Sequence, residues 1–223
     1  MKASDHIADF LHAQGVTHVF EVVGGMITHL IDSVHRRGKV KLVSVHHEQA
    51  AAFAAEAMGR STGVPGVAMA TSGPGAVNLL TGIGSCYFDS APAVFITGQV
   101  NLHEQKGRRA IRQLGFQETD IASMAEPITK AVFRVRSARS LPWVLEKAFR
   151  VALSGRPGPV LIDIPMDLQR EPVAAPGGRR MRPDAPAPVK AAAVEEVLSA
   201  LERAERPLIL VGGGVRSSRA LEG

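Results

Sequence analysis

Two histidines and a glutamate, His46-His47-Glu48, stand where a β-like run ends and an alanine-rich helical pattern begins. Ala51, Ala55 and Met58 follow Glu48 at helical spacing, so the helix face that carries Glu48 is expected to pack against protein. A carboxylate on a packed face is costly unless it is paired or protonated. Such a group suits chemistry in which a proton is donated or shared.

A structural role for Glu48 stays open as an alternative, whereas a metal site at the two histidines is excluded. Glu48 can also serve as a glutamate that stabilises the helix N-terminus through the helix dipole. His46 and His47 are neighbours in an extended segment and point to opposite faces, so they are not a metal pair. Because no other His/Cys cluster has ligand spacing, we assign no metal ligand in the sequence.

Glycine-bearing loops follow three of the predicted strands. They contain Gly24-Gly25, then Ser72-Gly73-Pro74-Gly75 with Asn78 close behind, and Gly212-Gly213-Gly214. Glycine allows the backbone to approach a ligand closely, and ligands of open α/β sheets bind at the carboxyl ends of the strands. Ordinary turn chemistry is the alternative for each loop. No GxxxxGK[ST] motif is present, so P-loop phosphate binding is not supported.

Apolar β-rich runs alternate with helical patterns along the first 170 residues. The predicted strands are Thr17–Val22, Val40–Val45, Gly66–Thr71, Ala93–Thr97, Ala131–Val135 and Val160–Ile164. Helices are predicted from Ser4, as the cap, to Gly15, and near 27–37, 48–61, 76–88 and 140–154. Runs such as Val67–Ala70 lack polar alternation and indicate strands buried on both faces. The pattern predicts an α/β fold, a parallel sheet with helices on both faces.

The rest of the chain predicts a linker and the start of a second α/β domain. We expect the first domain over 1–170 and a proline-rich linker over 171–189. Residues 190–223 then offer a helix over 190–204 and a strand, Pro207–Val211. One helix and one strand cannot bury a core, so this second unit reads as the beginning of a truncated central domain.

Bulk composition favours a cytoplasmic protein. The chain has 223 residues, a net charge of +5 and one cysteine, Cys86, which lies in an apolar helical stretch and is expected to fill the core. No apolar run is long enough to span a bilayer, and the charged N-terminus is not a signal peptide. With one Trp and one Tyr, the chain lacks the aromatic platforms of nucleic-acid binders.

Taken together, the motifs resemble the acetolactate synthase branch of the thiamine-diphosphate enzymes. The matching stretches occur in the family's order: HEQAAAFAAEAMGR at 47–60, ATSGPGAVNLLTGIGSCYFDSAP at 70–92, ITGQV at 96–100, GFQETDI at 115–121, PITK at 127–130 and GRPGPVLIDIPMDLQ at 155–169. The resemblance covers nearly all of residues 1–170 and reaches into 205–215. It implies that residues 1–170 form the family's pyrimidine-binding domain.

The resemblance implies a catalytic role for Glu48. In the family, the matching glutamate hydrogen-bonds N1′ of the aminopyrimidine ring of thiamine diphosphate. This favours the tautomer that takes the proton from thiazolium C2, and the carbanion then attacks a 2-oxo acid, from which CO2 leaves. The protein would thus be a lyase or transferase that decarboxylates and joins 2-oxo acids, as in branched-chain amino acid biosynthesis.

The same resemblance implies further site residues. These are Gly24 and Gly25 near the reacting carbon; Ser72, Gly73, Pro74, Gly75 and Asn78 beside the pyrimidine; Phe116 and Gln117 at the substrate pocket; and Arg156 at the FAD of acetolactate synthase. FAD is therefore an optional further cofactor. Arg156 as a plain loop charge remains the alternative.

Three departures from the family pattern matter. Val23 replaces the usual proline before Gly24-Gly25, and Glu21 replaces a common glycine. The segment NLHEQKGRRAIRQLG at 101–115 is longer than usual and basic, which favours an anionic 2-oxo acid or acceptor attracted by Lys106, Arg108, Arg109 and Arg112. Solvated surface charge without a role is an equal alternative.

The third departure is length. In the family a C-terminal domain holds the diphosphate through Mg²⁺ with a GDG…N motif, and the cofactor lies between domains of two subunits. This chain has no such motif and is expected to be inactive alone. We therefore expect either a homodimer or other homo-oligomer of a longer protein, or a second chain that supplies the diphosphate- and Mg²⁺-binding domain. A non-catalytic module is the remaining alternative, ahead of a nucleic-acid binder.

Overall fold

The computed structural model describes residues 1–174 and 188–218. The chain divides into two compact units, Met1–Pro183 and Asp184–Gly223, and each is considered by itself. Residues 175–187, most of the predicted linker, lie outside the described part. The predicted division into 1–170, 171–189 and 190–223 therefore stays a prediction.

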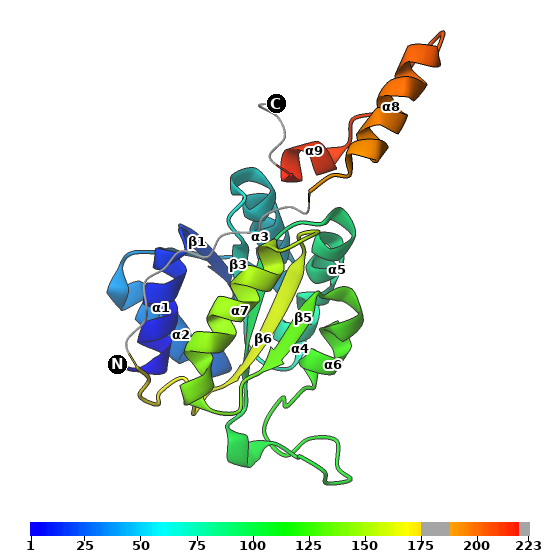
Figure 1. The fold of residues 1–223 in the computed structure, drawn as a ribbon. Coiled ribbons are helices and arrows are strands. Elements are labelled where there is room, and N and C mark those ends of the chain that lie inside the picture. Colours follow the sequence, from blue (N-terminus) through cyan, green and yellow to red (C-terminus); the bar gives the residue numbers. More distant parts are fainter. Residues whose placement is uncertain (175–187, 219–223) are drawn as a thin grey trace. The chain divides into compact units, whose positions relative to one another are not determined.

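The first unit contains one six-stranded sheet, in which every pair of neighbouring strands is parallel (Figure 1). The strands are β1 His18–Glu21, β2 Lys41–Ser44, β3 Gly66–Ala70, β4 Ala93–Gln99, β5 Ala131–Arg134 and β6 Pro159–Pro165. Their order across the sheet is β2-β1-β3-β4-β6-β5. All six predicted strands are present, with ends that differ by at most two residues.

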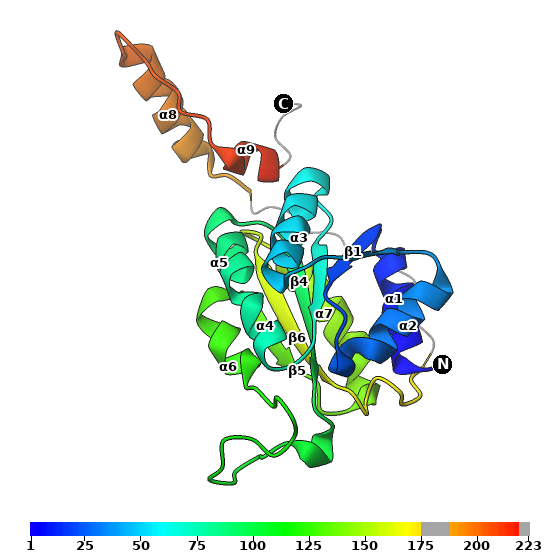
Figure 2. The same cartoon turned by 180° about the vertical axis from the view of Figure 1, so that it is seen from behind.

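Helices cover both faces of this sheet, which confirms the predicted α/β fold class. One face carries α1 Ala3–Ala13, α2 Thr28–Arg37 and α7 Leu141–Leu153, and α7 lies in front of the sheet in Figure 1. The other face, turned forward in Figure 2, carries α3 Glu48–Thr62, α4 Pro74–Asn78, α5 Leu80–Asp89 and α6 Ile121–Ala125.

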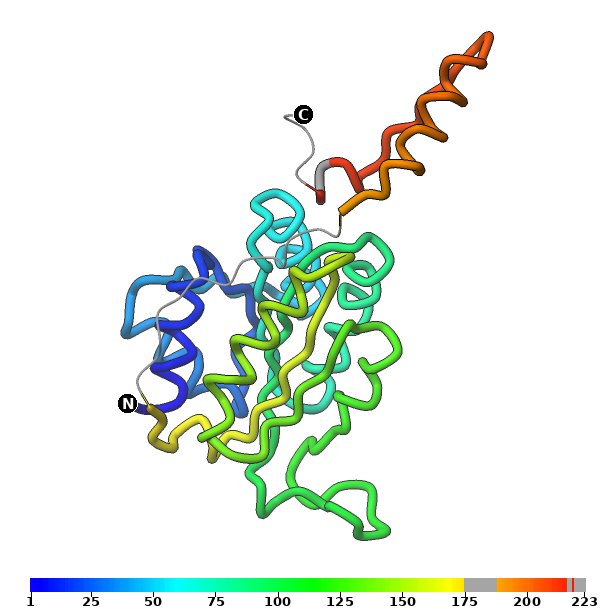
Figure 3. Tube along the Cα trace, in the orientation of Figure 1, coloured from blue at the N-terminus to red at the C-terminus, as the bar shows by residue number. Residues whose placement is uncertain are grey.

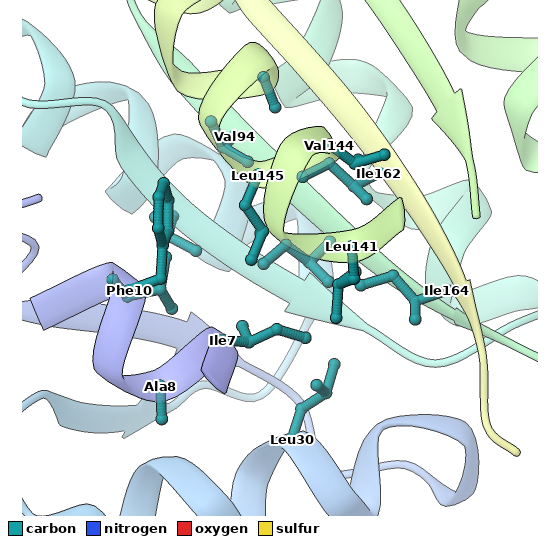
Figure 4. Packing of buried hydrophobic residues seen from close by; sticks show 14 of the residues in the cluster. Ile7, Ala8, Phe10, Leu30, Val94, Leu141, Val144, Leu145, Ile162 and Ile164 are labelled. Atoms are coloured by element: carbon teal, nitrogen blue, oxygen red, sulfur yellow. The ribbon is translucent and has the colours of Figure 1, made fainter. Parts of the chain in front are cut away.

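Alternate residues of the central strands belong to two separate hydrophobic cores, one on each face of the sheet. Val94 and Ile96 of β4 pack with α1, α2 and α7, whereas Ala93 and Phe95 pack with α3 and α5. Figure 4 shows the first core, where side chains of the three helices meet Val94 and Ile162. Because both faces are covered, every residue of β3, β4 and β6 is buried, and the strands are mostly apolar. Cys86 is buried in the second core, as predicted.

Two predictions about helices are wrong: the cap at Ser4 and the single helix over 76–88. Ser4 does not cap α1, because the helix begins at Ala3 and the Ser4 hydroxyl accepts a hydrogen bond from Ser33 Oγ at 2.9 Å. The free N–H groups of Ala3 and Ser4 instead donate to the carbonyls of Glu171 and Gln169 at 2.8 and 3.0 Å. A distant segment thus satisfies this helix end, and a local cap is not needed.

The predicted helix over 76–88 is two helices, α4 and α5, which meet at Leu79. The chain turns here while Leu79 stays fully buried. Gly15, by contrast, ends α1 as predicted, with a φ of 85° that suits glycine.

The second unit contains α8 Ala191–Arg203, as predicted, and a short α9 Gly213–Ser217. The predicted strand Pro207–Val211 is wrong, since these residues form neither helix nor strand. Leu208 and Leu210 are 91% and 94% exposed. A strand needs a neighbour for its N–H and C=O groups, and residues 188–218 provide none.

The packing of α3 on β3 depends on a glycine. A Cβ added to Gly66 would overlap the carbonyl of Ala55, whereas a Cβ on Gly84 in α5 would meet only ordinary contacts at 3.9 Å.

We expect Gly66→Ala to lower the free energy of unfolding by about 1–3 kcal/mol or more through overpacking. Gly84→Ala should leave it unchanged or raise it by up to about 1 kcal/mol through helix propensity. Urea denaturation of both variants tests this, and equal stabilities would contradict it.

Candidate active site

The sheet changes its direction of growth between β1 and β3. From β1 the chain passes to β2 on one side and then to β3 on the other side of β1. The carboxyl ends of β1 and β3 are therefore neighbours. In open α/β sheets, ligands bind in the crevice that diverging loops form at such a switch point. These two loops are the ones that carry Gly24-Gly25 and Ser72–Asn78.

Thr71 joins the two loops. Its Oγ1 accepts a hydrogen bond from the Met26 N–H at 3.2 Å, and a Cβ on Gly24 would overlap its side chain. Gln169, which is buried after β6, donates from Nε2 to the Met26 carbonyl at 2.8 Å. Gly24 is thus required by close packing. Neither Thr71 nor Gln169 was predicted as a site residue, because both act through contacts distant in sequence.

Glu48 is the first residue of α3 and faces the second loop. Asn78 Nδ2 donates to Glu48 Oε2 at 2.9 Å, and a Cβ on Gly75 would come within 2.9 Å of Glu48 Oε1. His47 caps the helix, as its Nδ1 accepts from the Gln49 N–H at 3.1 Å. The structure therefore brings Glu48, Gly75 and Asn78 together around one carboxylate.

The Glu48 face is less enclosed than the sequence pattern indicates. Ala51, Ala52 and Ala55 are fully buried, but Glu48 itself is half-buried. The reason is its position at the start of α3, beyond the end of the sheet. Within the described residues Glu48 Oε1 has no hydrogen-bond partner.

Gln117 contacts the second loop from a third segment of the chain. Gly73 has a φ of 72° and Gln117 a φ of 60°, both in the left-handed region. A Cβ on Gly73 would lie 2.7 Å from Cβ of Gln117, so the two residues are in close contact. A backbone conformation that a glutamine rarely adopts is typical of a site at which position matters more than local stability.

The other predicted residues on this edge lie at the rim or below it. Gly25 and Pro74 are exposed, and Phe116 is 74% exposed. Ser72 is buried, and its hydroxyl has no hydrogen-bond partner among the residues that the structure describes.

Arg156 lies at the amino ends of the parallel strands, opposite to the carboxyl ends near which the other site residues lie. It precedes β6, whereas the other site residues follow β1, β2, β3 and β4, and all strands run in the same direction. Its guanidinium Nε donates to Ser90 Oγ at 2.6 Å, and the side chain is exposed. The structure thus separates Arg156 from Glu48.

A buried polar network supports the Gln117 segment from below. Asp163 of β6 accepts from Thr97 Oγ1 at 2.7 Å and from Gln99 Nε2 at 3.2 Å. Gln99 Nε2 also donates to the Thr119 carbonyl at 2.8 Å, and Thr119 Oγ1 donates to the Gln117 carbonyl at 3.3 Å. Polar residues inside otherwise apolar strands are the sequence signal that could have revealed this network.

Within 1–174 and 188–218, no three His, Cys, Asp or Glu residues are grouped so that they could hold a metal ion. In the same part of the chain, no helix is long and apolar enough to cross a membrane.

Comparison with known proteins identifies the family. A family model described as thiamine pyrophosphate enzyme, N-terminal TPP binding domain, matches residues 1–124. The chain belongs to this family. Its relatives include the acetolactate synthase large subunit of Parasynechococcus marenigrum, 44% identical over 96% of this chain, and an acetolactate synthase of Arthrospira platensis, 41% identical over 93%. A chloroplastic acetolactate synthase of Arabidopsis thaliana is 37% identical over 97% of the chain.

The chain spans about a third of the length of these relatives. The aligned part is 35% of the Parasynechococcus protein, 36% of the Arthrospira protein and 32% of the Arabidopsis protein. The family and the thiamine-pyrophosphate-binding character of the N-terminal domain are therefore shown for this chain. The activity, substrates and partners of the whole enzyme are considered below as proposals.

The crevice residues fit the pyrimidine part of thiamine pyrophosphate. Glu48 Oε1 is free to hydrogen-bond a ring nitrogen, and the missing side chain of Gly75 keeps the space beside that oxygen open. The buried Ser72 hydroxyl has unused hydrogen-bonding capacity on the same loop. A planar heterocycle with polar edge atoms matches this set of groups.

The Asp163 network predicts an unusual dependence of stability on pH. Burial raises the pKa of Asp163 to about 6, although the hydrogen bonds from Thr97 and Gln99 act in the opposite direction. Because the folded protein holds this proton more tightly than the unfolded chain does, the stabilisation is full below about pH 4 and is lost as the pH rises through 6.

We therefore expect the free energy of unfolding of the wild type, minus that of Asp163→Asn, to fall by up to about 3 kcal/mol between pH 4 and pH 7. Parallel urea titrations at several pH values measure this difference. A difference that is constant over the range, or that grows with pH, would show that Asp163 does not titrate in this way.

Proposed function

We propose that this chain provides the pyrimidine side of the active site in a thiamine-diphosphate-dependent enzyme that decarboxylates 2-oxo acids and joins the product to an acceptor, as acetolactate synthases do. The observation that carries the proposal is the carboxylate of Glu48, fixed by Asn78 and left accessible by Gly75, at the switch point of the sheet. The similarity to acetolactate synthases over almost the whole chain supports the reaction class.

Glu48 is proposed as the catalytic residue. Asn78 holds Oε2, so that Oε1 is directed for a hydrogen bond to the aminopyrimidine ring and can hold or share a proton there. Asn78 therefore positions the carboxylate, and Gly75 keeps the approach to Oε1 clear. Thiamine diphosphate, when bound, supplies the nucleophilic carbon and the electron sink for decarboxylation.

The loops around Glu48 would bind the rest of the pyrimidine and part of the substrate. Gly24 and Gly25 let the first loop approach the reacting centre, and Ser72-Gly73-Pro74-Gly75 forms the wall beside the ring. Phe116 and Gln117 would contact the substrate. The support for this is the contact between Gly73 and Gln117, which brings the substrate residues next to the pyrimidine loop.

We further propose that the diphosphate and its Mg²⁺ are bound outside residues 1–223. The relatives are about three times as long as the aligned region, which leaves ample room for such a domain. It would belong either to another copy of a longer form of this protein, in a homo-oligomer, or to a second chain. Catalysis then requires assembly, and we propose the cytoplasm as its location.

FAD is a separate proposal. Arg156 would contact a flavin from the opposite edge of the sheet, where its guanidinium is exposed and bonded only to Ser90 within the described residues. A flavin there would not compete with the pyrimidine for the site at Glu48. It would stabilise the structure and take no part in the reaction.

Replacing Glu48 by glutamine should abolish cofactor activation without loss of the fold. In the enzyme completed with its diphosphate-binding domain, we expect Glu48→Gln to slow hydrogen–deuterium exchange at C2 of bound thiamine diphosphate by at least about 100-fold, the lower range for a positioned acid–base group. NMR after acid quench measures this exchange.

Glu56→Gln is the matched control, because Glu56 lies on the same helix and pairs with Arg60 away from the crevice. It should leave the exchange rate within about twofold of the wild type. Wild-type exchange in Glu48→Gln would sink the assignment of Glu48.

Calorimetric titration with thiamine diphosphate and Mg²⁺ separates the catalytic proposal from the non-catalytic alternative. The chain alone holds only the pyrimidine side, so we expect weak binding, and at least tenfold tighter binding when a chain with the diphosphate-binding domain is added. Unchanged affinity on addition would favour a non-catalytic module. The Glu48→Gln variant shows whether the gain depends on this site.

A further inference from the structure

A second hollow lies next to the candidate active site. It is a cavity of about 220 Å³ between the carboxyl ends of β4, β5 and β6 and the segment 105–120, which projects beyond the sheet as the green loop in Figure 3. Asp163 and Gln99 line it on the sheet side, and Lys106 and Arg112 on the loop side. The proposed function makes no use of this cavity.

Three carboxylates line the cavity, and the protein already satisfies all of them. Glu118 accepts from the backbone N–H groups of Lys106 and Leu114 at 2.7 and 2.8 Å. Asp120 accepts from Ser123 and pairs with Arg134 at 3.0 Å. Asp163 accepts from Thr97 and Gln99. These acids hold the walls together and are not available to cations in the cavity.

The cations are in the opposite situation. Lys106, Arg112 and Arg136 also line the cavity, and none of the three side chains forms a hydrogen bond or ion pair with any described residue. The remaining cation, Arg134, is held by Asp120 and Ser123. Three unpaired positive charges around one small hollow repel each other and attract anions.

We propose that this cavity binds a small, multiply charged anion, a dicarboxylate or a phosphate, through Lys106, Arg112 and Arg136. The guanidinium groups of Arg112 and Arg136 suit the planar edge of a carboxylate or two oxygens of a phosphate, and the Lys106 ammonium adds a point charge. The cavity volume of about 220 Å³ is large enough for an anion of this size. The claim does not depend on the role of Glu48.

The cavity wall is connected to the candidate active site. Thr119 lines the cavity, and its hydroxyl donates to the carbonyl of Gln117. An anion bound here would lie near Thr119, which is two residues along the chain from Gln117. The side chain of Gln117 contacts Gly73. Amide signals of Gly107 and Thr119 should report its binding directly.

The test is an NMR titration of the purified chain with inorganic phosphate and, separately, with succinate, at constant ionic strength kept with sodium chloride. We expect saturable shifts of the Gly107 and Thr119 amides with at least one of the two anions. The preferred anion tells whether the natural ligand carries a phosphate or two carboxylates. Arg112→Ala and Lys106→Ala should each weaken this binding at least fivefold.

Arg108→Ala is the matched control, because Arg108 carries the same charge on the same loop but does not line the cavity. It should change the affinity less than twofold. Spectra outside residues 100–120 must be unchanged in all three variants, which shows that the fold is intact. The proposal is overturned if neither anion gives saturable shifts, or if Arg108→Ala weakens binding as much as Arg112→Ala, since diffuse loop charge then accounts for the effect.

Discussion

The parallel pairing of β1 with β2 on one side and with β3 on the other side is the constraint on which the candidate site depends. Glu21 at the end of β1 is level with Ser44 on β2 and with Met69 on β3, so the three strands end close to the same height. The loops that follow must diverge there, because one leads back under the sheet to α2 and the others lead to α3 and α4. Any change in this register would move Glu48 away from Asn78.

Close backbone approach then turns this edge into a defined site. Gly24 fits against Thr71, Gly73 against Gln117 and Gly75 against the Glu48 carboxylate. Each of these glycines lies where a side chain would collide with another segment, so the three loops can pack as one wall. The glycines thus serve the packing of the loops, and Gly75 also serves access to Glu48.

Polar side chains in the sheet also hold the loop after β4, which contains Gln117. Asp163 and Gln99 would be unfavourable in apolar strands if they were unpaired, but together with Thr97 they satisfy one another. Gln99 uses its second amide hydrogen to hold Thr119, and through it the residues next to Gln117. Asp163, Gln99 and Thr119 also line the cavity of the proposed anion site, which therefore shares one wall with the candidate active site.

The six strands and the residue types of the site could be predicted from the sequence alone. Period and composition were sufficient for the six strands, since a strand covered on both faces must be mostly apolar, as β3 is. The glycine loops and Glu48 could also be chosen from their place at strand ends. Tertiary structure decided what local pattern does not contain: the carbonyls of Gln169 and Glu171 that replace a cap at Ser4, the lack of a strand within 188–218 to pair with Pro207–Val211, and the half-buried state of Glu48. It also placed Arg156 on the edge opposite to Glu48. In each case the deciding partner is distant in sequence, and only the folded chain shows whether that partner is present.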